Sequence, residues 1–255
     1  ALVIRETFWG GTSISFKTNP NPDLPNDVNQ TVADDTFDQI NEWFTTYPNV
    51  DGVYVDSLGR LWPALLNYST DHFNYAKYPL TFDPDGRVAL HNKISHYEFL
   101  EQLRLQLHAQ DRFLFANGMY AYPTSSNPPE HYRGGGIMVG RFFVASLLDG
   151  LSSEPGVDPP QHRWSFMRTS MGKKLCTLLN YEWEEIPGEV EDYLNKALCY
   201  GVFATNSRDP VTGEDYIGNP DGYDRDAELL NWFIPNVRKL SRAGWEPVTF
   251  AEVIT

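Results

Sequence analysis

Hydrophobic and polar residues in this chain follow two kinds of pattern, one typical of strands and one typical of helices. Residues 53–55 place Val, Tyr and Val in the two-residue period of a short strand, whereas residues 91–109 repeat apolar side chains at the three- and four-residue spacing of an amphipathic helix. The same reasoning predicts further strands starting near residues 2, 113, 150, 175 and 199, and further helices near 34–47, 137–148, 160–171, 189–197 and 226–243. Strand and helix therefore alternate along most of the chain.

This alternation predicts the fold class, because parallel strands need crossover connections that are usually helices. Polar residues follow the predicted strands in turn: Asp56, Asn117, Glu154, Asn180 and Asn206. An open doubly wound sheet would instead gather its ligand residues near one switch point and carry a glycine-rich nucleotide loop, and neither is evident. We therefore predict an α/β protein with a TIM-type (β/α) barrel.

The number of strands is smaller than a closed barrel requires. Six predicted strands are found, counting residues 2–6, whereas the barrel has eight. We expect the first one or two β/α units to be absent from this chain, and to be supplied by a missing N-terminal barrel segment or replaced by irregular strands. Residues 1–255 are expected to form a single catalytic barrel domain, with a long substrate-side loop at 57–90.

Charge and composition narrow the classes of partner. The formal net charge of −14 disfavours nucleic acid and anionic membrane surfaces, and no apolar run approaches the roughly 20 residues of a membrane span. The two cysteines, Cys176 and Cys199, lie in predicted strands and are expected to be buried free thiols. Localisation stays open, with a slight preference for an extracellular or periplasmic site.

Two strand-end carboxylates suggest the chemistry. Hydrolysis of a glycosidic bond requires one ionised and one protonated carboxyl group on either side of the bond. Asp56 is the candidate nucleophile and Glu154 the candidate acid/base, with Glu182 as the rival acid. Each has a simpler structural interpretation, because Asp56 could cap the next loop or pair with an arginine, and Glu154 could be a surface turn residue.

The remaining candidate site residues are expected to bind the sugar. Asn117, Asn180 and Glu182 follow predicted strands, and Trp62 and Tyr68 are the aromatic residues best suited to stack on sugar rings. Neither a metal nor an organic cofactor is expected. The histidines show no ligand spacing, since even His91 and His96 are five positions apart rather than four.

The segment Asp51-Gly52-Val53-Tyr54-Val55-Asp56 resembles the nucleophile strand of retaining α-glycosidase barrels, which include α-galactosidases, α-glucosidases and endo-α-N-acetylgalactosaminidases. The resemblance implies that Asp56 is a fourth-strand nucleophile and that a later strand-end carboxyl is the acid/base. Residues 240–248 resemble the end of a last barrel helix, which is compatible with an accessory β domain.

A second resemblance, to chitinase-like barrels, lacks the catalytic glutamate of that family. Chitinase-like barrels carry Asp-Gly-x-x-x-Asp-x-Glu, and this chain has Leu58 in place of the glutamate and Tyr54 in place of the middle aspartate. The two strand-end carboxylates and the resemblance to α-glycosidases lead us to expect a glycoside hydrolase that acts on an oligo- or polysaccharide and retains the anomeric configuration. The alternative is a non-catalytic carbohydrate-binding or structural barrel protein in a larger assembly.

Overall fold

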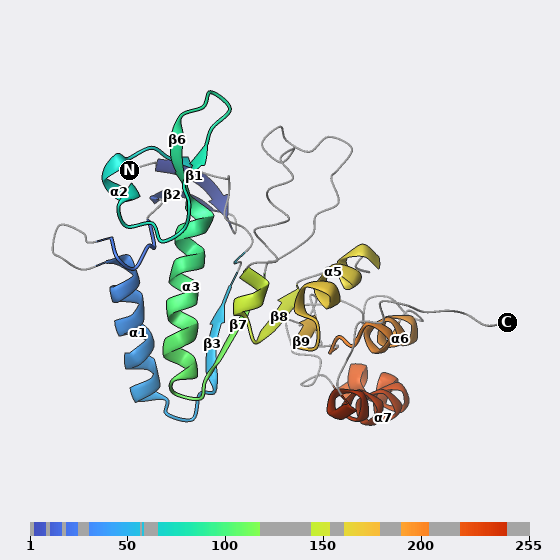
Figure 1. The fold of residues 1–255 in the computed structure, drawn as a ribbon. Coiled ribbons are helices and arrows are strands. Elements are labelled where there is room, and N and C mark those ends of the chain that lie inside the picture. The colour runs from blue at the N-terminus through green and yellow to red at the C-terminus, as the bar shows by residue number, and fades with distance from the viewer. Residues whose placement is uncertain are drawn as a thin grey trace. The chain divides into compact units, whose positions relative to one another are not determined.

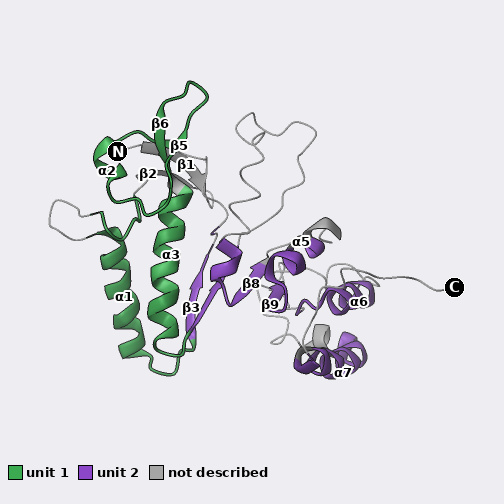
Figure 2. Cartoon of the chain, viewed as in Figure 1, with its two compact units in different colours: residues 1–51, 62–112 green, residues 52–61, 113–255 purple. Residues whose placement is uncertain are grey.

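The computed structural model describes residues 3–8, 11–16, 19–24, 31–56, 58, 66–117, 144–153, 161–178, 190–203 and 220–243. The chain divides into two units, shown in different colours in Figure 2. Unit 1 comprises Ala1–Asp51 and Trp62–Arg112, and unit 2 comprises Gly52–Leu61 and Phe113–Thr255. A single domain over residues 1–255 stays a prediction.

Unit 2 contains a parallel sheet (Figure 1). Its four strands are β3 (Gly52–Val55), β7 (Phe113–Ala116), β8 (Gly150–Ser153) and β9 (Leu175–Leu178), paired in the order β3-β7-β8-β9. Phe203 extends the sheet through a parallel bridge to Thr177. Within the described part of this parallel sheet, the spatial order of the strands therefore follows their order in the chain.

Helices connect the later strands of this sheet. Residues 144–147 are helical before β8, α5 (Gln161–Met171) joins β8 to β9, and α6 (Val190–Tyr200) follows β9. The last helix is α7 (Pro220–Ala243). The predicted mixed α/β class with a parallel sheet is confirmed. The four parallel strands alone do not make a closed barrel, so the barrel stays a prediction.

One face of the sheet is buried against apolar side chains. The register places Val55, Ala116, Leu151 and Cys176 side by side across the four strands. The last three are at most 1% exposed, and the Cys176 thiol lies 3.8 Å from the carbonyl oxygen of Met167 in α5. This is the hydrophobic face that the short apolar strands require, and α5 packs on it.

Side chains on the opposite face form a different row. Tyr54, Phe115, Gly150 and Leu175 are register partners, and the rings of Tyr54 and Phe115 lie 5.5 Å apart between centroids. A methyl group on Gly150 would overlap the Phe115 ring. The absence of a side chain at Gly150 therefore leaves the space that the Phe115 ring occupies.

A buried arginine satisfies the carbonyl groups where two helices of unit 2 end. The Arg168 guanidinium donates to the carbonyl oxygens of Tyr200, Gly172, Lys174 and Gly201, of which the Tyr200 bond measures 2.8 Å. Carbonyls in a last helical turn have no partner within the helix. The planar guanidinium thus links the end of α5 to the end of α6.

Unit 1 is built on two long helices, α1 (Val32–Thr46) and α3 (Asn92–His108). Thr31 and Asp34 form a reciprocal capping box that starts α1. The buried face of α1 includes Phe37, whose ring stacks on Phe99 of α3 with 5.3 Å between centroids. This contact between the two amphipathic helices belongs to the core of unit 1.

Short antiparallel strands complete unit 1. Strands β4 (Leu66–Asn67), β6 (Val88–His91) and β5 (Thr81–Phe82) form a sheet in that order, with the short helix α2 (Thr70–Phe73) between β4 and β5. Strands β1 (Val3–Phe8) and β2 (Gly11–Phe16) form a separate antiparallel hairpin.

Three predictions are corrected here. Residues 2–6 were expected to supply a barrel strand, but among the described strands β1 pairs with β2 alone, and the pairing is antiparallel. The segment 57–90 was expected to be a long loop, but its described part carries β4, α2, β5 and the start of β6. Cys199 was expected in a buried strand, but it is exposed and lies in α6, which ends before Gly201 with a positive φ of 63°.

Candidate functional site

Polar side chains form a row at the carboxyl end of the parallel sheet. Extending the strand register by one residue places Asp56 beside Asn117 and Asn117 beside Ser152, which is paired with Thr177. Because side chains alternate between the faces of a sheet, this row lies on the face opposite Val55 and its neighbours. In parallel α/β folds, this end of the strands is where ligand groups gather.

Hydrogen bonds join Asn117 to Asp56 and to the residues on either side of it, Val55 and Leu58. The Asn117 side-chain amide donates to Oδ1 of Asp56 at 2.7 Å. The backbone N–H of Asn117 donates to the Val55 carbonyl at 3.2 Å, and the Asn117 carbonyl accepts from the Leu58 N–H at 3.1 Å. Asn117 is 1% exposed whereas Asp56 is exposed, so a buried amide orients an accessible carboxylate.

Ser152 and Thr177 form the second half of the row. Their hydroxyl oxygens lie 2.9 Å apart, which is a hydrogen bond in which either can be the donor. Ser152 is 1% exposed and Thr177 is half-buried. Sequence reasoning missed both residues because they precede the strand ends, although the two-residue period does place them on the face of Asp56.

The row offers a carboxylate, an amide and two hydroxyl groups on neighbouring strands. Asp56 can act as a nucleophile or a base, or accept hydrogen bonds from a ligand. Hydroxyl and amide groups suit a polar neutral ligand with many hydroxyls, because they can donate and accept. Among the described residues, no group of three or more His, Cys, Asp or Glu side chains is arranged to hold a metal ion.

The predicted site residues fall into three groups. Asp56 and Asn117 are brought together, as their positions after parallel strands suggested. Glu154, Asn180, Glu182 and Trp62 lie outside the described residues. Tyr68 is described, but it belongs to unit 1. Its role in binding sugar stays a prediction.

Tyr68 takes part in a polar cluster of its own unit. Its hydroxyl donates to Oδ2 of Asp83 at 3.0 Å, and the Arg87 guanidinium carbon lies 4.7 Å from the centre of its ring. Arg87 also pairs with Asp83 at 2.7 Å. The hydrogen bond to the Asp83 carboxylate raises the pKa of Tyr68 above its ordinary value. The cluster stabilises the turn between β5 and β6.

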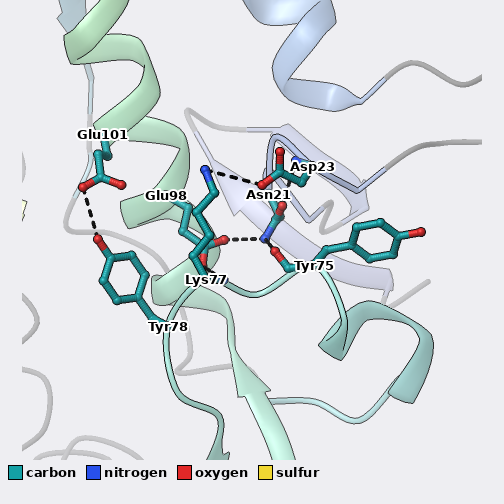
Figure 3. A network of polar contacts seen from close by, with 7 residues as sticks. All are labelled: Asn21, Asp23, Tyr75, Lys77, Tyr78, Glu98 and Glu101. Atoms are coloured by element: carbon teal, nitrogen blue, oxygen red, sulfur yellow. Dashed lines mark hydrogen bonds and ion pairs between the residues drawn. The ribbon is translucent and has the colours of Figure 1, made fainter.

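A buried carboxylate in α3 forms another cluster in unit 1 (Figure 3). Glu98 is 1% exposed and accepts from the Asn21 side-chain amide and, at 2.8 Å, from the Lys77 backbone N–H. The Asn21 amide also donates to the Tyr75 carbonyl at 2.9 Å. Burial raises the pKa of Glu98. With these donors in place the cluster is a structural link between α3 and two irregular segments.

Comparisons with known proteins add no family or relative. No protein-family model, curated protein or solved structure matches this chain. Within the parts of the chain that the structure describes, no helix has both the length and the apolar character needed to cross a bilayer. The polar row, which consists of Asp56, Asn117, Ser152 and Thr177, is therefore the basis on which a function is proposed.

Proposed function

We propose that this protein is a glycoside hydrolase that cleaves a bond within an oligo- or polysaccharide, with Asp56 as the nucleophile of a retaining mechanism. The observation that carries the proposal is the hydrogen bond from the buried Asn117 amide to the exposed Asp56 carboxylate. A nucleophile must be held at a set angle to the anomeric carbon, and a donor on one carboxylate oxygen does this.

The barrel is part of the same proposal. The parallel strands are neighbours in chain order, as they are in a (β/α) barrel, and the polar row lies at their carboxyl ends. The face that carries Tyr54, Phe115 and the polar row would then be the barrel interior. The face that packs on α5 would be the layer between strands and helices.

The acid/base partner is proposed to be Glu154, with Glu182 as the second candidate. Glu154 is the next residue in the sequence after Ser153, which ends β8, and β8 is separated from β3 only by β7. Two strand spacings amount to about 10 Å between backbones. Carboxyl groups that lean toward each other across this span could reach the roughly 5 Å separation of a retaining pair.

In the proposed reaction, Asp56 attacks the anomeric carbon while the acid protonates the leaving oxygen. The resulting glycosyl ester is hydrolysed by a water molecule that the same acid/base residue deprotonates. The hydroxyl group of the half-buried Thr177 would bind a sugar hydroxyl near the cleaved bond, while the buried Ser152 and Asn117 side chains orient Thr177 and Asp56.

The test is hydrolysis of a glycan panel by the wild type and by Asp56→Ala, Glu154→Gln and Glu182→Gln. We expect Asp56→Ala to lose activity by at least about a thousandfold and only one glutamate variant to do the same. Asp51→Asn is the matched control, because Asp51 is also an exposed carboxylate next to β3. Turnover that survives in Asp56→Ala would remove Asp56 from the mechanism. Glycan binding by the wild type without turnover would favour a carbohydrate-binding protein.

A further inference from the structure

A groove between α6 and α7 lies outside the polar row. It has a volume of about 300 Å³ and is lined by Glu191, Leu194, Asn195, Glu228, Leu229 and Trp232. Both helices belong to unit 2, where they lie next to each other (Figure 1). This volume is at the lower end of the range for small-molecule sites, so the groove suits a ligand of a few heavy atoms.

Helical spacing brings the polar and apolar lining residues together. Glu191 and Asn195 are four positions apart on α6, and Glu228 and Trp232 are four positions apart on α7. Residues at this spacing lie on the same helix face. The groove therefore has a carboxylate on each helix, with the Leu194 and Leu229 side chains also lining it.

The charge of the groove is not neutralised within the described residues. Neither Glu191 nor Glu228 forms an ion pair or a hydrogen bond with another described residue. The neighbouring Asp192 of α6, in contrast, pairs with Lys196 at 2.7 Å. Both carboxylates line the groove, so each would attract a cation bound there.

An exposed indole adds a second, independent feature. Trp232 is 51% exposed and lines the groove beside these carboxylates. The face of an indole ring attracts ammonium and guanidinium groups, and Trp is the strongest of the aromatic residues in this respect. The apolar lining can bury the alkyl part of such a ligand.

We infer that the α6/α7 groove binds a small free organic cation, consisting of an ammonium or guanidinium group on a short alkyl chain. The charged group would lie between Glu191 and Glu228 and against Trp232, and the alkyl chain against the two leucines. This site is independent of the proposed hydrolase activity, because it uses none of the residues of the polar row.

The test is an NMR titration of the Trp232 indole N–H, assigned by its loss in Trp232→Phe. The probes are n-butylammonium and agmatine, compared with n-butanol as the neutral analogue. We expect saturable shifts with both cations, no comparable shift with butanol, and binding at least about tenfold weaker in the double variant Glu191→Gln/Glu228→Gln. Added salt should weaken binding as well.

Matched controls come from α1 of unit 1. Glu42→Gln and Trp43→Phe change an exposed carboxylate and a 57% exposed indole that do not line the groove, and both should leave binding unchanged. Equal weakening by Glu42→Gln would show attraction to the overall negative charge and overturn the inference. Equal shifts with butanol or the absence of saturable binding would overturn it too.

Discussion

The side-chain amide of Asn117 donates a 2.7 Å hydrogen bond to the Asp56 carboxylate, and the two residues come from neighbouring parallel strands. The backbone of Asn117 also bonds to Val55 and Leu58, on either side of Asp56. The position of the candidate nucleophile is therefore set by the adjacent strand as much as by its own.

This relationship predicts a pH-dependent effect of Asn117→Asp. Two carboxylates would then face each other at hydrogen-bond distance, which raises the pKa of one of them in the folded protein. The folded state would bind more protons than the unfolded state above about pH 4, so the unfolding free energy should fall as the pH rises through that range. We expect a loss of about 1–3 kcal/mol near pH 7 and a smaller loss near pH 4, measured by urea denaturation.

The control for this experiment is Asn231→Asp, which places a carboxylate at an exposed position of α7. It should change the unfolding free energy little at either pH. A loss of the same size at both pH values in Asn117→Asp would contradict the predicted carboxylate repulsion.

Gly150→Ala should destabilise unit 2, because the added methyl group overlaps the Phe115 ring. Overpacking of this kind costs about 1–3 kcal/mol. The double variant Gly150→Ala/Phe115→Leu should recover part of the loss, since the smaller side chain leaves room for the methyl group. Thermal unfolding of the two single variants and the double variant measures this coupling, and simple additivity would argue against the contact.

The two cysteines should differ in reactivity. Burial raises the pKa of the Cys176 thiol to about 11, and this side chain is 0% exposed, whereas Cys199 is exposed. Since the thiolate is the reactive form, a thiol reagent at mildly alkaline pH should modify Cys199 in the native protein and Cys176 only after unfolding. In the control variant Cys199→Ser, native labelling should disappear. Rapid labelling of Cys176 in that variant would contradict its burial.

Tyr78 should ionise late in an alkaline titration. Burial, helped by the hydrogen bond to Glu101, raises its pKa from 10.0 to about 12. The folded state therefore keeps a proton that the unfolded state loses, and the stability that Tyr78 contributes is present below pH 10 and lost as the pH rises toward 12. Ultraviolet difference spectra of the wild type against Tyr78→Phe report the titration. Glu101→Gln should move it to lower pH, and a midpoint near 10 in the wild type would contradict the assignment.

Local sequence patterns predicted the elements of unit 2 well, because strand and helix periods are properties of short segments. The Val53–Val55 alternation of β3 is an example, and the apolar repeat of α3 is a second example, from unit 1. The same reasoning failed for residues 66–91, where β4 and β5 have two residues each and are too short to show a period. It also failed at Cys199, since the apolar run 199–203 looks like a strand and only Gly201 marks the end of α6.

The candidate site was only partly predictable. Asp56 and Asn117 each follow a strand, so their proximity could be inferred once the strands were taken as parallel neighbours. Ser152 and Thr177 depend on the register between β8 and β9, which no single strand reveals. Patterns within single segments therefore locate the ends of strands, but they do not show which side chains lie side by side on neighbouring strands.

The connection from β3 to β7 limits how this protein can be shortened. Strand β3 ends at Val55 and β7 begins at Phe113, and most of the chain between them belongs to unit 1. Because β3 and β7 are parallel, the carboxyl end of one and the amino end of the other lie at opposite edges of the sheet. A tight turn cannot join these ends, and a crossover of about a dozen residues or more is needed. A minimal version of the parallel sheet that omits unit 1 would therefore need a designed crossover segment in its place.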